Sequence, residues 1–195
     1  MTESAHDPAP VVDWIPAPDF GGDLPGRLGM TALPGKHGPS DRYPGRVYRG
    51  DLDHDLTALR DARVVRLVLL VEDHELRRWG DPDIVNRAGV LGLAVDRHPM
   101  PDGGTPADIG SMRAILASIA AARASGDVAV ACMGGVGRSG MVVACALVAA
   151  GWEPDAAIAR VRDVRHPTAV ETAAQRDFVR KFHHAVHGSD PKVAP

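Results

Sequence analysis

The spacing of apolar and polar positions changes several times along the chain. Three short runs rich in valine and leucine, at residues 64–71, 90–98 and 127–133, are typical of buried strands. Residues 27–34 predict a further short strand that ends at a proline. These four segments are the strands that we expect in the core.

Segments with helical spacing of their apolar positions separate these strands. Asp55 is the predicted N-cap of the first helix, and Thr105, followed by Pro106 and Asp108, is the predicted start of the fourth. The predicted helices cover residues 56–64, 72–79, 82–88, 105–124, 137–150, 153–164 and 171–187. Because strands and helices alternate, we expect an α/β fold with a central, mostly parallel sheet of about four to five strands and helices on both faces, in three layers.

The beginning of the chain differs in composition from the rest. It holds most of the prolines and many of the glycines, which excludes a long helix there. It also carries Trp14, Ile15 and Phe20, so we expect residues 1–26 to pack on the domain as an extended strap. Such a strap would either shield the rim of a pocket or cover apolar surface. Residues 27–187 then form the domain, and residues 188–195 form a flexible tail.

Composition and charge narrow the classes of function. The chain has 195 residues and a formal net charge of −3, whereas a general nucleic-acid binder would be more basic. Two cysteines make no disulfide framework and no leader opens the chain, so we expect a cytoplasmic protein. The longest apolar run, residues 141–150, falls far short of the roughly 20 residues of a membrane span, so we expect no membrane partner.

The most informative stretch, CMGGVGRSG, follows the last predicted strand directly. Gly135, Gly137 and Gly140 match the spacing of a dinucleotide-binding loop. A dinucleotide fold needs another strand and an acidic residue about 20 positions later, and here another helix follows instead. A Walker A loop needs a lysine before the serine, and this chain has Arg138 there. Both nucleotide-binding interpretations are therefore disfavoured.

A different chemistry is indicated by Cys132, which five residues separate from Arg138. A thiol ionises readily where backbone N–H groups and a helix N-terminus converge on it. The intervening glycines let those N–H groups and the Arg138 fork converge on one centre, which suits a tetrahedral dianion. Ser139 can hydrogen-bond the sulfur and help it leave. The predicted phosphate-binding residues are Met133, Gly134, Gly135, Val136, Gly137 and Arg138.

The Cys-x5-Arg spacing resembles the signature of the cysteine-dependent tyrosine and dual-specificity protein phosphatases. One departure is Ala131, where many members have a histidine that orders the loop. The resemblance implies an aspartate on a loop ahead of the cysteine strand, which protonates the leaving oxygen. Asp102 in HPMPDGGTP is placed in that way, and Asp108 is the second candidate.

Both motifs together resemble the kinase-associated branch of the dual-specificity group. The segments TALPGKHG and RHPTAVETAAQRDFV also resemble that branch, so the similarity extends over residues 27–186. It implies that Gln175 helps to position the hydrolytic water. It further implies a hydrolase that needs no metal or cofactor and acts on phosphotyrosine, phosphoserine or phosphothreonine of a phosphorylated protein through a cysteinyl-phosphate. Phosphate, sulfate or vanadate would fit the same loop.

Two other functions use the same type of loop. A catalytically weak pseudophosphatase would bind phosphorylated partners, and Ala131 is the feature that favours it. A sulfur-transferring or arsenate-reducing enzyme is the other; the arsenate reductase would need a resolving cysteine, for which Cys145, in an apolar helix, is the only candidate. His183, His184 and His187 are spaced for a metal, but their position at a helix C-terminus favours interaction with the helix dipole.

Overall fold

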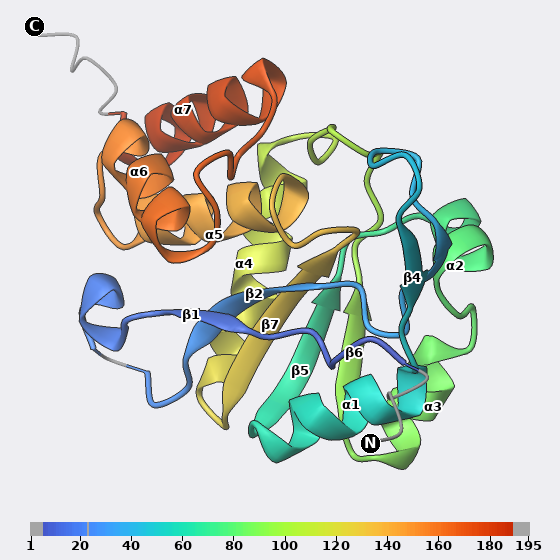
Figure 1. The fold of residues 1–195 in the computed structure, drawn as a ribbon. Helices are drawn as coiled ribbons and strands as arrows, with labels where there is room; N and C mark the ends of the chain where they lie inside the picture. The colour runs from blue at the N-terminus through green and yellow to red at the C-terminus, as the bar shows by residue number, and fades with distance from the viewer. Residues whose placement is uncertain (1–5, 23, 189–195) are drawn as a thin grey trace, which may run out of the picture.

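The computed structural model describes residues 6–22 and 24–188, which form one five-stranded sheet, a two-stranded hairpin and helices on both faces of the sheet (Figure 1). The sheet has the strand order β1-β2-β7-β5-β6. The strands are β1 (Asp13–Ile15), β2 (Leu28–Ala32), β3 (His37–Pro39), β4 (Val47–Arg49), β5 (Val64–Leu69), β6 (Ala94–Arg97) and β7 (Asp127–Cys132). Strands β3 and β4 form the hairpin.

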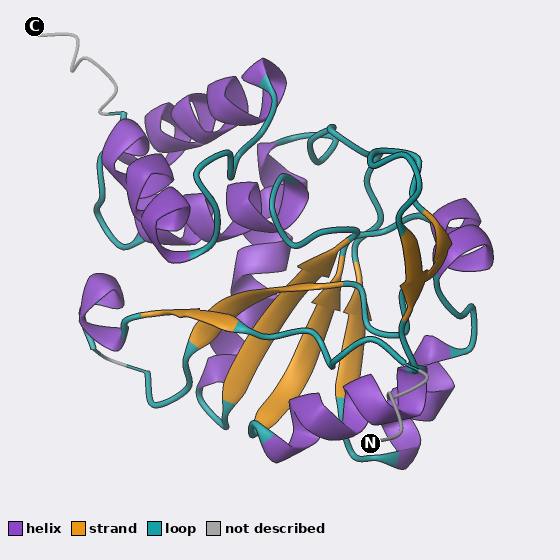
Figure 2. Ribbon diagram, viewed as in Figure 1, coloured by secondary structure: helices purple, strands orange, loops and turns teal. Residues whose placement is uncertain are grey.

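The helices lie in two layers, one on each face of the sheet (Figure 2). Helices α1, α2 and α3 belong to one layer, and α4 to α7 belong to the other. The helical segments are η1 (Ala17–Phe20), α1 (Leu52–Asp61), α2 (Asp73–Trp79), α3 (Ile84–Val90), α4 (Ile109–Arg123), α5 (Arg138–Ala149), α6 (Pro154–Val164) and α7 (Ala173–His187).

The pairing of the strands confirms the predicted fold. Strand β7 lies at the centre, parallel to β2 on one side and to β5 on the other, and β6 continues the parallel array. Strand β1 is antiparallel to β2 at one edge. The sheet is thus mostly parallel, as the alternation of strands and helices predicts.

Strand β7 divides its side chains between the two layers with a period of two. Val128, Val130 and Cys132 belong to the core beneath α4 to α7, whereas Ala129 and Ala131 face the core beneath α1 to α3. All of them are buried. The last residue of the strand therefore holds Cys132 at the carboxyl edge of the parallel strands, where ligands bind in open α/β sheets.

Two predicted helix starts were wrong, and in both the N-cap is an aspartate other than the predicted residue. Asp51 caps α1 by accepting the N–H of His54, while Asp55 is buried inside the helix and accepts the N–H of Gly35 at 2.7 Å. Helix α4 is capped by Asp108, not by Thr105. An aspartate near a helix start can accept a hydrogen bond from a distant backbone N–H as readily as from the first turn of its own helix. The sequence alone does not show which of these two hydrogen bonds it makes.

The first part of the chain contains a strand that its proline- and glycine-rich composition does not predict. Within the predicted strap, β1 pairs with β2, and residue 7 exchanges backbone and side-chain hydrogen bonds with Arg49 of β4. Strand β6 begins at Ala94, later than predicted, because α3 continues to Val90 and Gly92 turns the chain. The boundary after residue 26 stays a prediction. Most of the predicted tail, residues 189–195, lies outside the described residues.

Candidate active site

The loop of residues 132–138 joins β7 to α5 and needs glycine at defined positions. Gly135 has a φ of +69°, and a Cβ there would lie 2.4 Å from the carbonyl oxygen of Thr31. A Cβ on Gly137 would lie 2.5 Å from Oε2 of Glu171, the end of a flexible side chain that can move aside. Gly135 is thus the glycine that lets the loop turn tightly against β2.

Arg165, the C-cap residue of α6, fixes the orientation of two peptide groups in this loop. Its Nη2 donates to the carbonyl oxygen of Gly134 at 2.8 Å, and its Nε donates to that of Gly135 at 3.0 Å. In a trans peptide the N–H points opposite to the C=O. The N–H groups of Gly135 and Val136 therefore point away from Arg165.

Arg138 is buried, with 1% of its side chain exposed, and is held by a carboxylate that the sequence analysis missed. Its Nη1 and Nη2 donate to Oε2 and Oε1 of Glu75 at 2.7 and 2.8 Å, and Nη1 also donates to the carbonyl of Met100 at 3.0 Å. Burial by itself would raise the pKa of Glu75, but the hydrogen bonds and charge of Arg138 outweigh it and lower that pKa. The Arg138 guanidinium is thereby held in one orientation and in its charged form.

Asp102 lies beside this guanidinium, on the loop that precedes α4. Its Oδ1 is 3.0 Å from Nη2 of Arg138, while 81% of its side chain is exposed. The start of the loop is attached to the sheet, because the N–H of Met100 donates to Leu70 at 3.1 Å. The structure therefore brings Asp102, Arg138 and Cys132 to one cavity, as the motifs predict.

The far side of the Asp102 loop is held by the N-terminus of α7. Thr172 donates to the carbonyl of Gly103 at 2.9 Å, and the amide Nε2 of Gln175 donates to that of Gly104 at 3.1 Å. Gln175 is fully buried, and its Oε1 accepts the N–H of Thr172 in a capping box. The Gln175 amide thus joins the Asp102 loop to the N-cap of α7, and its predicted contact with a hydrolytic water stays a prediction.

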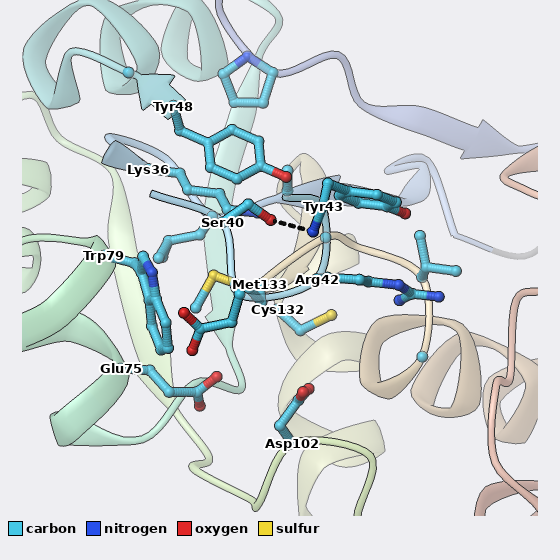
Figure 3. Close-up of a pocket in the computed structure, with 18 of the residues that line it drawn as sticks. Lys36, Ser40, Arg42, Tyr43, Tyr48, Glu75, Trp79, Asp102, Cys132 and Met133 are labelled. Atoms are coloured by element: carbon cyan, nitrogen blue, oxygen red, sulfur yellow. Dashed lines mark hydrogen bonds between the residues drawn. The ribbon is translucent and has the colours of Figure 1, made fainter. Parts of the chain in front are cut away.

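The cavity over Cys132 has a volume of about 590 Å³, and the hairpin β3–β4 forms one of its walls (Figure 3). Tyr43 and Tyr48 of the hairpin line the cavity together with Trp79 of α2. In Figure 3 the sulfur of Cys132 lies between the side chains of Arg42 and Asp102. The sulfur thus lies at the base of a space much larger than a phosphoryl group.

The tip of the hairpin, residues 40–46, is attached to both sides of the cavity. Arg42 donates to Glu171 at 2.5 Å, ahead of α7, and Arg78 of α2 donates to Asp41 at 2.7 Å. The hydrogen bond with Glu171 raises the pKa of Arg42. The sequence analysis missed this hairpin because its strands are short and rich in glycine, proline and charge.

Comparison with known proteins identifies the family. The family model described as Cyclin-dependent kinase inhibitor 3 (CDKN3) matches residues 14–158. The rat protein cyclin-dependent kinase inhibitor 3 is 30% identical over 158 residues, which cover 80% of this chain and 71% of that protein. The human protein of the same name is 28% identical over 158 residues, which again cover 80% of this chain and 71% of that protein. This chain belongs to the cyclin-dependent kinase inhibitor 3 family.

Solved structures agree with this membership. A kinase-associated phosphatase whose catalytic cysteine was replaced by serine superposes with a TM-score of 0.81 at 24% identity, covering 94% of this chain and 99% of that one. The active form of Tk-PTP has a TM-score of 0.65 at 27% identity, covering 82% and 92%. The cyclin-dependent kinase inhibitor 3 family is thus the kinase-associated branch of the dual-specificity phosphatases, and the resemblance seen in the sequence is confirmed.

Two side chains near the signature loop of this family member are buried without a hydrogen-bond partner. One is Ser139, whose Oγ lies in the first turn of α5, next to Arg138. The other is Thr31, whose Oγ1 is on β2 in register with Ala131 of β7. Ser139 thus keeps its hydroxyl free for the sulfur, as its predicted role requires, although that role stays a prediction.

The other sequence candidates lie away from the cavity or have structural roles. Asp108 is the N-cap of α4 and accepts the N–H of Ser111 at 2.7 Å. Burial raises the pKa of the Cys145 thiol strongly. The rings of His183 and His187 lie with their centroids 5.1 Å apart and are tilted by 45° to each other. Over residues 6–22 and 24–188 no group of three metal-binding side chains occurs, and no helix is long and apolar enough to span a membrane.

Proposed function

We propose that this chain hydrolyses phosphomonoesters on proteins through a covalent cysteinyl-phosphate intermediate. One observation carries the proposal: Cys132, Arg138 and Asp102 meet in a single cavity, and a buried carboxylate holds the Arg138 fork in place. A nucleophile, a bidentate cation for phosphoryl oxygens and an exposed acid are the groups that this reaction needs.

In the first step the Cys132 thiolate attacks phosphorus and an S–P bond forms. The bond between phosphorus and the ester oxygen breaks, and its electron pair goes to that oxygen, which takes a proton from the carboxyl group of Asp102. The Arg138 guanidinium and the loop N–H groups hold the other phosphoryl oxygens. Asp102 is mostly exposed, so it can reach a leaving group at the cavity mouth.

In the second step water attacks phosphorus and passes its proton to the Asp102 carboxylate. The S–P bond breaks, and its electron pair returns to the sulfur of Cys132, which accepts a hydrogen bond from Ser139. Gln175 would orient the attacking water through its amide. Phosphate and the starting thiolate are the products, and no metal or cofactor takes part in either step.

The substrate that we propose is a phosphorylated protein. The cavity of about 590 Å³ leaves room for a side chain beyond the phosphoryl group, and its aromatic wall suits an apolar linker. A phosphorylated kinase is one such substrate, since a solved relative is named a kinase-associated phosphatase. We also propose a cytoplasmic location, because two cysteines make no disulfide framework.

A second candidate is a module that binds phosphorylated partners without turnover. Ala131 favours it, because the side chain that orders the loop in many relatives is missing and Thr31 opposite it has no partner. The intact Cys132, Arg138 and Asp102 favour the hydrolase instead. Thiol-dependent arsenate reduction is disfavoured because burial keeps Cys145 protonated.

Hydrolysis of p-nitrophenyl phosphate in the presence of EDTA distinguishes these functions. We expect turnover by the wild type, none by Cys132→Ser, and slower turnover by Asp102→Ala with the basic limb of its pH profile lost. Protection of Cys132 from iodoacetamide by phosphate, without release of nitrophenol, would instead establish the binding module.

A further inference from the structure

One ion pair connects the N-terminal segment with the residue that holds the phosphate-binding loop. Asp13, the first residue of β1, accepts a hydrogen bond from Nη1 of Arg165 at 2.5 Å. Pairing of β1 with β2 sets Asp13 opposite Met30, so the position of the carboxylate is fixed by the sheet. The partner, Arg165, is the residue that holds the phosphate-binding loop.

All three nitrogen positions of the Arg165 guanidinium are occupied by different partners. Nε and Nη2 donate to the carbonyls of Gly135 and Gly134, and Nη1 donates to Asp13. Asp13 is the only negatively charged group among these three. With 14% of the Arg165 side chain exposed, its charge is largely removed from water, so the carboxylate is what stabilises it there.

We propose that Asp13 is a positioning residue for catalysis, acting through Arg165 on the phosphate-binding loop. The two carbonyls turned toward Arg165 direct the N–H groups of Gly135 and Val136 to the other side, where the phosphoryl oxygens are to be bound. If Asp13 is lost, the guanidinium has two neutral partners and the two peptide groups lose their fixed orientation. This inference rests on the proposed function, because it requires that the loop binds a phosphoryl group.

The chain provides a matched control in the same segment. Asp19, in η1, accepts from Nε of Arg160 in α6 at 2.6 Å, so it also ties the N-terminal segment to α6 through an aspartate–arginine pair. Arg160 has no hydrogen bond to the loop among the described residues. Loss of Asp19 therefore weakens the attachment of the segment and leaves the loop carbonyls held.

The experiment compares Asp13→Asn, Asp13→Glu and Asp19→Asn with the wild type. Inorganic phosphate is titrated against the rate at which iodoacetamide alkylates Cys132, which yields a dissociation constant without turnover. Hydrolysis of p-nitrophenyl phosphate supplies kcat and KM, and thermal unfolding reports the loss of each ion pair. Cys145 does not interfere, because burial strongly raises the pKa of its thiol, whereas Cys132 lines the cavity.

We expect Asp13→Asn to weaken phosphate binding and to lower kcat by about tenfold each. Asp13→Glu should recover most of the phosphate affinity and of kcat. In Asp19→Asn both values should stay within about twofold of the wild type, although its melting temperature falls by a similar amount. Equal behaviour of Asp13→Asn and Asp19→Asn, in a wild type that binds phosphate and turns over, would overturn the inference alone. A wild type that neither binds phosphate nor turns over would overturn the proposed function together with it.

Discussion

Arg138 is a cation buried at the base of the active site, and Glu75 is the residue that permits it to be there. Moving a guanidinium out of water costs several kcal/mol, which only close, well-oriented partners offset. Glu75 supplies two parallel hydrogen bonds and the compensating charge. Asp102 also lies close, but its side chain is mostly exposed, so water screens its charge.

Replacement of Glu75 by glutamine should therefore affect both folding and catalysis. We expect the free energy of unfolding in urea to fall by about 3 kcal/mol, because the buried charge of Arg138 loses its partner. We also expect kcat/KM to fall at least tenfold, because the fork is no longer fixed. Asp73→Asn is the control, because Asp73 lies on the same helix as Glu75 and pairs with Arg97 of β6, but 70% of its side chain is exposed. A stability as high in Glu75→Gln as in Asp73→Asn would contradict this account.

Cys132 and Arg138, the two residues of the Cys-x5-Arg signature, were predictable from the sequence because they lie within one stretch of seven residues. Cys132 and Arg138 are where the motif places them, and Asp102 follows from the loop before α4. Glu75 and Arg165 were not predicted. Their partners are 63 and about 30 residues away, so nothing in the local pattern distinguishes them from surface charges.

At the scale of elements, the N-terminus of α7 is what holds the loop that carries the acid. Thr172 is the N-cap residue and uses the same hydroxyl to accept the N–H of Gln175 and to donate to Gly103. Gly103 follows Asp102 and has a φ of +69°. The hydrogen bond thus restrains a flexible turn at the residue next to the acid.

Substitution of Thr172 by alanine should loosen this attachment. We expect a loss of about 1 kcal/mol in the free energy of unfolding, typical of a missing N-cap. Because the acid is less well placed, we also expect kcat to fall more for a phenyl phosphate with a poor leaving group than for p-nitrophenyl phosphate. Thr172→Ser keeps the hydroxyl and should restore both values. An equal effect of Thr172→Ala on the two substrates would show that the loop is held by other means.

Long elements with clear periodicity were predicted well, and short ones were not. Helices α4 to α7 lie within a few residues of their predicted bounds, because each has an apolar stripe or a continuous apolar run. Strand β1 and the hairpin β3–β4 have three residues per strand, which is too few for a pattern. Their pairing depends on tertiary neighbours, and they supply the Asp13 carboxylate and one cavity wall.

For the whole molecule, the carboxyl groups that pair with arginines set the stability at acidic pH. Burial would raise the pKa of both Glu75 and Asp127, but hydrogen bonds from Arg138 and Arg27 outweigh it and lower both. A carboxyl whose pKa is lower in the folded state stabilises the fold above its ordinary value, which is 4.5 for Glu75 and 3.8 for Asp127. That stabilisation is lost as the pH falls through the folded pKa.

We therefore expect the free energy of unfolding to fall as the pH is lowered from about 5 to about 3. Asp55 acts in the opposite direction, because burial raises its pKa and protonation then favours the folded state. Urea unfolding, monitored by tryptophan fluorescence at several pH values, measures the net effect of these carboxyl groups on the free energy of unfolding. Glu75→Gln should make the decrease shallower, and an unchanged slope in that variant would remove Glu75 from the explanation.

The sheet as a whole assembles the site from segments that are distant in the chain. The nucleophile ends β7 and the cation follows it, the acid follows β6, and Glu75 follows β5. The carboxyl ends of three parallel strands thus place these groups at one edge of the sheet. The α/β class was predictable from the order of the elements. The walls of the cavity were not, because they depend on the hairpin and on Asp7, Pro8 and Pro10 of the N-terminal segment, whose composition indicates no such role.

The central claim is the covalent intermediate, and it is tested most directly by trapping it. Ser139→Ala is mixed with a phosphopeptide labelled with radioactive phosphorus, and the reaction is quenched in acid within milliseconds. We predict label on the tryptic peptide that contains Cys132, formed as fast as the dephosphorylated peptide appears, and none in Cys132→Ser. Release of phosphate without labelled Cys132, or turnover by Cys132→Ser, would contradict the mechanism.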